Sequence, residues 1–135
     1  MPDIARAPFA AYAPPIKVSD EKYSGELAAE GQGLFVRFRG TISTPNPSVL
    51  LNPFVDAVHE RIAASGPGVV TVDLHELEFC NSSGFKAFIY WIQRLQELPE
   101  ADQYRLRFLL SPTRRWQRTS LLALTCFAPS KVELQ

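Results

Sequence analysis

The sequence carries no excess charge of either sign and very little cysteine or histidine. Its 14 Lys and Arg residues balance 14 Asp and Glu residues, and it has two Cys and two His. A net charge of zero removes the bulk electrostatic attraction that draws basic proteins to nucleic acids or anionic membranes. Cys80 and Cys126 lie far apart and match neither a disulfide framework nor a metal-ligand pattern. We therefore expect buried free thiols in a reducing compartment.

Long apolar runs are also absent. No run approaches the roughly 18 residues that a membrane-spanning helix needs. Prolines and charges interrupt the first residues, which therefore lack the apolar core of a signal peptide. The interrupting residues are Pro2, Asp3, Arg6, Pro8, Pro14 and Pro15. We expect a cytoplasmic protein without a membrane or nucleic-acid partner.

What the sequence does contain is enough apolar material for one folded domain. Hydrophobic residues make up 46% of its 135 residues, which fits a single domain with its own core. Residues 1–18 are rich in Ala and Pro and show no apolar period, so they are predicted to form a flexible or extended tail. Residues 19–135 are predicted to form the domain.

Apolar periodicity in the predicted domain indicates alternating strands and helices. Period-two alternation or β-branched runs predict strands at 22–29 (an edge strand), 34–39, 68–74, 104–110 and 131–134. Helical spacing predicts helices that start at Asn52-Pro53, Ser83 and Ser111-Pro112. The order β-β-α-β-α-β-α-β implies an α/β domain. Its mixed sheet of four or five strands would be packed with helices, with parallel crossovers through the middle.

The segment Asn81-Ser82-Ser83-Gly84 places two adjacent hydroxyls at a strand-to-helix junction. Backbone N–H groups at a helix start are unpaired and favour negative charge. A serine at such a junction can cap the helix, attack a substrate or be phosphorylated. These three roles stay open for Ser82, whereas Ser83 is expected to be a hydroxyl at the helix start.

A serine hydrolase would need a base and an orienting acid for Ser82. The candidate bases are His75 and His59, and the candidate acid is Asp73. The nucleophile motif Gly-x-Ser-x-Gly lacks its first glycine here, because Cys80 stands at that position. We therefore expect a protein that is not an enzyme and that binds no cofactor.

The junction and its surroundings resemble the STAS domains, the family of bacterial anti-sigma-factor-antagonist proteins. Leu77-Glu78-Phe79-Cys80-Asn81-Ser82-Ser83-Gly84 is similar to the family motif, apolar-apolar-Asp-Ser-Ser/Thr-Gly. Phe108-Leu109-Leu110-Ser111-Pro112 is similar to the family's last strand and the helix start after it. The likeness spans roughly residues 22–134 and includes the order of the elements. It implies a STAS-like single domain in a bacterial partner-switching pathway.

In that family the hydroxyl directly after the acidic residue is phosphorylated, and the corresponding residue is Ser82. The resemblance implies a signalling switch whose unmodified form binds a partner and whose phosphorylated form does not. The implied partners are a GHKL-type serine kinase or anti-sigma factor and a PP2C-type phosphatase. Asn81 replaces the family's acid, so a second interpretation stays open, a scaffold or interaction domain that is not phosphorylated. Asn81 is expected to cap the helix, and Gly84 to allow close backbone packing or open access.

The helix after the junction carries the candidate partner contacts. Lys86 lies four residues after Ser82 and is placed to meet a phosphate or an acidic partner residue, or it is a solvated lysine. Tyr90 and Trp91 lie toward the exposed side of the predicted helix, where aromatic residues indicate an interface. Packing of Trp91 under a neighbouring helix is the alternative.

A local group of arginines is a weaker signal. It consists of Arg105, Arg107, Arg114, Arg115 and Arg118, with no acidic residue between 105 and 118. Such a cluster binds an anion, a nucleotide or an acidic partner surface, or it simply lines the solvated faces of one strand and one helix. The sequence leaves both interpretations open, as it does the oligomeric state.

Overall fold

The computed structural model describes residues 15–30 and 33–135. The elements in chain order are β1 (Ile16–Ser19), β2 (Tyr23–Glu30), β3 (Gly33–Ile42), α3 (Ser48–Ser65), β4 (Val69–Cys80), α4 (Ser82–Gln96), a 3-10 turn (Glu100–Asp102), β5 (Arg105–Leu109), α5 (Arg115–Phe127) and β6 (Val132–Leu134). In the described chain the strands form one six-stranded sheet in the order β1-β2-β3-β4-β5-β6. The pairs β1–β2 and β2–β3 are antiparallel, and β3 to β6 are parallel. The predicted mixed α/β domain is confirmed.

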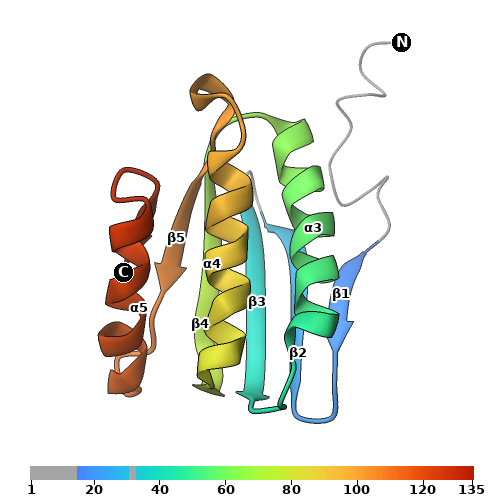
Figure 1. Ribbon diagram of the computed structural model, residues 1–135, viewed down its shortest axis with the longest axis vertical. Coiled ribbons are helices and arrows are strands. Elements are labelled where there is room, and N and C mark those ends of the chain that lie inside the picture. Colours follow the sequence, from blue (N-terminus) through green and yellow to red (C-terminus); the bar gives the residue numbers. More distant parts are fainter. Residues whose placement is uncertain (1–14, 31–32) are drawn as a thin grey trace.

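The three α-helices of the described residues cover one face of the sheet (Figure 1). Each helix follows a parallel strand and crosses back, because parallel neighbours need such a crossover connection. As a result, α3, α4 and α5 all begin at the end of the sheet where the C-termini of β3, β4 and β5 lie (Figure 1). None of the described helices has the length and hydropathy to span a bilayer.

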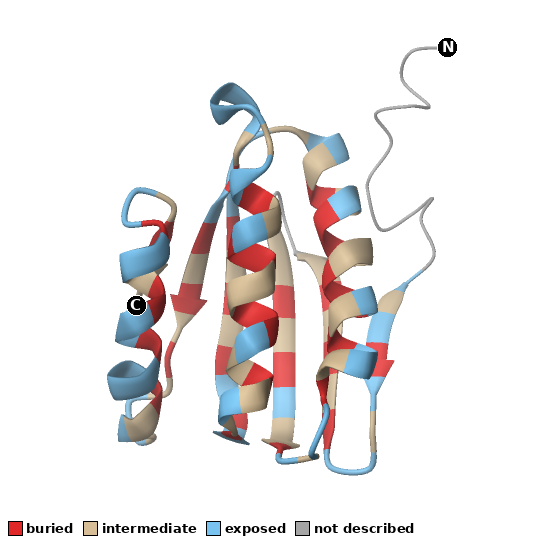
Figure 2. Cartoon of the chain, viewed as in Figure 1, coloured by how far each residue is buried: buried red, intermediate tan, exposed pale blue. Residues whose placement is uncertain are grey.

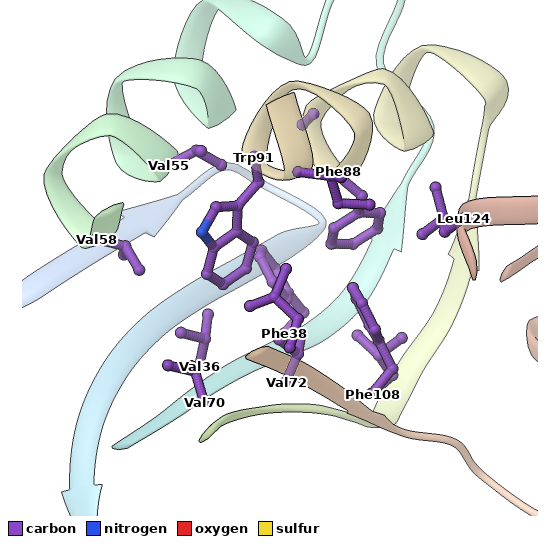
Figure 3. Close-up of a cluster of buried hydrophobic side chains, with 14 of the residues drawn as sticks. Val36, Phe38, Val55, Val58, Val70, Val72, Phe88, Trp91, Phe108 and Leu124 are labelled. Carbon is purple, nitrogen blue, oxygen red and sulfur yellow. The ribbon is translucent and has the colours of Figure 1, made fainter. Parts of the chain in front are cut away.

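The core lies between the helices and the sheet face that they cover (Figure 2). Val36 and Phe38 of β3, Val72 of β4 and Phe108 of β5 are buried against the helices (Figure 3). Phe88 of α4 meets Phe38 and Phe108 edge to face, with ring centroids 5.5 and 5.7 Å apart. Such pairs stabilise by about 0.5–1.5 kcal/mol beyond the burial of their area. They fix α4 over the middle of the sheet.

The opposite face of the sheet carries charged side chains that pair across strands. Arg37 of β3 donates to Asp73 of β4 at 3.0 Å, and Arg107 of β5 pairs with Glu133 of β6 at 3.2 Å. Alternation of buried apolar and paired charged residues is typical of a sheet with one face in water. Because these pairs are partly exposed, each contributes no more than about 1 kcal/mol. Their main effect is to keep this face polar.

The strand count and the N-terminal boundary differ from the prediction. The sheet has six strands in the described residues instead of four or five, and β1 begins at Ile16, inside the stretch assigned to the tail. Residues 1–14 of the predicted tail lie outside the described residues. Ile16 pairs with Leu27, so β2 is not an edge strand. A four-residue strand is too short for its own periodicity to reveal it, and only the pairing with β2 defines it.

Helix α3 begins earlier than predicted. Its first residue is Ser48, with Pro47 at the N-cap position, and Pro53 lies inside the helix. The prediction of Asn52 as the cap is therefore wrong. Leu51 is buried, so the additional first turn brings apolar contacts that offset the N–H which Pro53 lacks.

Helix α5 begins later than predicted, at Arg115 and not at Ser111. Residues 111–114 form a turn that the buried Gln117 side chain holds. The Ser111 main-chain N–H donates to Gln117 Oε1 at 2.7 Å, and Gln117 Nε2 donates to the main-chain oxygens of Leu74 and Leu77 at 2.7 and 2.9 Å. The proline thus follows the strand in a turn that precedes the helix.

Candidate functional site

Strand β4 reaches the site through two irregularities in its pairing with β3. Between Arg37↔Asp73 and Arg39↔Glu76, and again between Gly40↔Leu77 and Thr41↔Phe79, β4 advances one residue more than β3. Such bulges re-aim the following side chains and are frequent next to functional sites. The strand then ends level with Ile42, whose main-chain oxygen accepts from the Asn81 N–H at 2.9 Å.

Asn81 caps α4 and also ties the helix start to the loop between β3 and α3. Its Oδ1 accepts from the Gly84 N–H at 2.7 Å, as an N-cap side chain does. Its Nδ2 donates to the main-chain oxygen of Thr44 at 2.9 Å. The predicted cap is confirmed, and the second bond is one that an aspartate cannot make, because a carboxylate has no N–H to donate.

Gly84 is buried where the first turn of α4 packs on the ends of β3 and β4. A Cβ at this position would lie 2.6 Å from Cys80 Sγ and 2.8 Å from Ile42 Cγ2. The predicted close packing is thus confirmed. Burial raises the pKa of the Cys80 thiol to about 12, so Cys80 is a packing residue. Cys126 is free but exposed, so the expectation that both thiols are buried is wrong for Cys126.

Ser82, the first residue of α4, is exposed. Ser83 is half-buried, and neither hydroxyl forms a hydrogen bond with another group in the part of the chain that the structure describes. Because Asn81 performs the capping, Ser82 is not the cap. Lys86 is exposed one turn further along α4.

The residues of the hydrolase interpretation do not come together. His75 Nδ1 lies 2.9 Å from Asp73 Oδ1, but five strand residues separate His75 from the end of β4, roughly 15 Å of extended chain. His59 is buried and contacts the Tyr104 hydroxyl at 2.7 Å. Ser82 therefore has neither histidine as a base. Within the described residues no group of three or more His, Cys, Asp and Glu is placed to hold a metal ion.

Trp91 is a core residue, so its prediction as a partner contact is wrong. It is fully buried, its Nε1 donates to the Tyr104 hydroxyl at 2.8 Å, and it faces α3 near Val55 and Val58 (Figure 3). The spacing along α4 placed it on the flank of the helix, and that flank is the one that α3 covers. Tyr90 is half-buried and donates to Asp56 Oδ1 of α3 at 2.6 Å, so its hydroxyl is already engaged.

An aromatic patch that the sequence interpretation did not identify as a site lies next to Ser82. It consists of Phe79, Phe85 and Trp116. The side chain of Phe79 is 48% exposed, and its ring centroid lies 6.5 Å from that of Trp116. The rings of Phe85 and Trp116 lie 6.3 Å apart. The sequence around Phe79 does not indicate that its side chain is exposed, because the neighbouring Leu77 and Cys80 are buried. The bulge at residue 78 turns Phe79 outward.

The comparisons with known proteins bear on the fold. No family model and no curated protein matches this chain. A chain of the crystal structure of the diguanylate cyclase SiaD in complex with its activator SiaC from Pseudomonas aeruginosa has a TM-score of 0.52 and 18% identity, over 88% of this chain and 98% of that one. An anti-sigma factor antagonist from Mycobacterium paratuberculosis has a TM-score of 0.49 and 18% identity, over 80% and 86%. The likeness to the chain of the SiaD–SiaC structure shows a shared fold, and this fold agrees with the mixed α/β class expected from the sequence.

Proposed function

We propose that this chain is a regulatory protein-binding module, not an enzyme, and that phosphorylation of Ser82 releases its partner. The observation that supports this proposal is the exposed Ser82 hydroxyl beside the aromatic patch, free of the capping role that Asn81 performs. A kinase can reach this hydroxyl. A partner that covers the patch would also meet Ser82, because Phe79 and Phe85 each lie three residues from Ser82.

The energetics of a phosphate at Ser82 fit such a switch. A phosphate adds about −1.5 to −2 charge at pH 7. The start of α4 would stabilise it by about 0.3–1 kcal/mol, and Lys86 lies one turn away. A partner pressed on the same surface would have to desolvate the dianion, which costs several kcal/mol. Inverting the bound and released populations from 1:99 to 99:1 takes about 5.5 kcal/mol of differential affinity. The desolvation cost is of this order, so the switch requires no refolding of the domain.

The proposed partners are proteins of a bacterial signalling pathway in the cytoplasm. The similar chain comes from a structure of the cyclase SiaD in complex with its activator SiaC, which supports a protein ligand for this fold. The resemblance to anti-sigma-factor antagonists adds a GHKL-type serine kinase or anti-sigma factor and a PP2C-type phosphatase as the enzymes that would write and erase the phosphate. ATP would bind the kinase, so this chain would need no cofactor.

The switch is tested by phosphorylation in vitro. The full chain, Ser82→Ala and the matched control Ser83→Ala are each incubated with ATP and the GHKL-type kinases of the source organism. Phosphate is then located by mass spectrometry. The proposal expects one phosphate on Ser82 in the wild type, none in Ser82→Ala and unchanged labelling in Ser83→Ala. Equal labelling of the Ser82→Ala variant, or an unlabelled wild type, would refute it.

A second candidate function is an interaction domain that is never phosphorylated. It is favoured by Asn81, which stands where a kinase of the resembled family would meet an acidic residue. The Asn81 amide is instead bonded to the main-chain oxygen of Thr44. Under this alternative no kinase labels the wild type, yet disruption of the aromatic patch still abolishes partner binding. Labelling and binding measured on the same set of variants therefore separate the two candidates.

A further inference from the structure

The arginines between residues 105 and 118 fall into two groups in the structure. Arg105 and Arg107 lie on the open face of the sheet and pair with Glu133, at 3.7 and 3.2 Å. The remaining three line a hollow of about 370 Å³ where β5 passes into α5, and we name it the arginine hollow. They are Arg114, Arg115 and Arg118. The first group is explained by its ion pairs, and the second is not.

No acidic side chain in the part of the chain that the structure describes lines the arginine hollow. Of the described residues that line it, none is acidic, and neither Arg115 nor Arg118 forms an ion pair with a described residue. Arg114 Nε donates to the main-chain oxygen of His75 at 3.5 Å, which is a neutral acceptor. The main-chain oxygen of Gln135, at the rim, already accepts from the Leu110 N–H at 3.2 Å. Three arginines therefore line one concave surface that has no acidic side chain among its described residues.

The chemistry of this surface matches a phosphate group. Guanidinium groups are always charged, and their planar forks bind phosphate oxygens in a bidentate manner. The positive end of the α5 dipole adds to the field, because α5 begins at Arg115. We propose that the arginine hollow binds the phosphate of a small phosphorylated molecule. Its volume lies at the lower end of the range for small-molecule pockets, about 300–1,000 Å³, and suits a ligand the size of a mononucleotide.

The chain contains a built-in reporter for this site. Trp116 directly follows Arg115, whereas Trp91, the other tryptophan of the sequence, is fully buried under α3. Trp116 is not among the residues that line the hollow, so its fluorescence would report a ligand only through the neighbouring Arg115, and calorimetry is the primary measurement. Trp116 also contacts Phe79 and Phe85, so the first turn of α5 contributes residues both to the hollow and to the aromatic patch.

The test titrates the full chain with adenosine monophosphate, inorganic phosphate and adenosine at constant ionic strength, by tryptophan fluorescence and by calorimetry. The variant Arg115→Gln/Arg118→Gln removes two exposed guanidinium groups from the hollow. Its matched control, Lys17→Gln/Lys22→Gln, removes the same charge from exposed positions near β1. Circular dichroism and thermal melting confirm that both variants are folded.

The expected result is saturable binding of the nucleotide that the arginine variant weakens by about tenfold or more, as the loss of charged hydrogen bonds predicts. The lysine control should bind like the wild type. If inorganic phosphate binds as tightly as the nucleotide, the ligand is free phosphate. If inorganic phosphate binds more weakly, the ligand is a phosphate ester. The proposal is overturned if neither probe binds saturably, if adenosine binds as well as the nucleotide, or if both variants lose affinity equally.

Discussion

Replacing Asn81 by Asp should destabilise the domain, although the change restores the acid of the resembled family. The Asn81 side chain makes two hydrogen bonds, one from the Gly84 N–H at 2.7 Å and one to the Thr44 oxygen at 2.9 Å. Aspartate keeps the first bond, because it is as good an N-cap as asparagine. It loses the second bond and instead sets a carboxylate oxygen against a carbonyl oxygen.

The magnitude follows from these two bonds. Loss of the bond to Thr44 costs about 0.5–1.5 kcal/mol, and the unpaired, partly buried acceptor together with the repulsion raises the cost toward 3 kcal/mol. The negative charge at the start of α4 returns about 0.3–1 kcal/mol. We therefore expect a net loss of about 1–2 kcal/mol for Asn81→Asp. Asn81→Ala, which loses the cap as well, should lose about 2–3 kcal/mol.

The assay is urea unfolding at pH 7, followed by the fluorescence of the two tryptophans, of which Trp91 is fully buried. A loss of about 1 kcal/mol lowers the urea midpoint by about 0.3–1 M, so the variants are easily resolved. Ser82→Ala is the control, because its hydroxyl makes no hydrogen bond with the described residues and its removal should change stability by less than about 0.5 kcal/mol. If Asn81→Asp is as stable as the wild type while Asn81→Ala is destabilised, the bond to Thr44 contributes nothing and the reasoning fails.

Three further predictions concern packing, pH and binding. Gly84→Ala should cost about 1–3 kcal/mol in urea unfolding, because the added methyl meets Cys80 Sγ at 2.6 Å, and wild-type stability would contradict this packing. Burial, and then the charge of nearby Arg94, lower the pKa of His59 in the folded protein. As the pH drops below about 6.5, His59 is therefore protonated in the unfolded chain before it is protonated in the folded protein, and the free energy of unfolding should fall. In urea unfolding at pH 5 and pH 7, the non-titrating His59→Asn should show a smaller decrease, and an equal decrease would exclude His59 as the cause. Phe79→Asp should abolish capture of the protein partner, whereas Phe127→Asp, at a phenylalanine with the same 48% exposure, should not, and equal binding by both would exclude the patch.

Local patterns predicted most of the fold because they and the tertiary packing agree. The alternation in residues 104–110 and the helical spacing after Ser83 each describe an element whose apolar residues meet the same core. Prediction failed where a tertiary contact defines the element. Strand β1 exists through its pairing with β2, and Pro53 is tolerated in α3 because the preceding turn buries Leu51. Neither contact has a signature within a short window of sequence.

The candidate site divides in the same way. Asn81 and Gly84 were predictable, because cap chemistry and close packing are local properties of a helix start. The exposure of neighbouring aromatic residues was not, since it depends on which flank a neighbouring element covers. Helix α3 buries Trp91, and a bulge in β4 exposes Phe79. Spacing alone therefore placed Trp91 at the surface and gave no indication of the exposed Phe79.

The amide at position 81 also changes what a phosphate at Ser82 would meet. With an acid at position 81, a carboxylate and a phosphate dianion would adjoin, and two unit charges about 5 Å apart repel by about 1 kcal/mol even in water. Asn81 removes this repulsion, and through Thr44 it holds the loop on the other side of the junction. The start of α4 is thus a better site for a phosphate than its acidic counterpart would be. If Ser82 is phosphorylated, the neutral neighbour leaves the modified domain about 1 kcal/mol more stable than it would be with an acid at position 81.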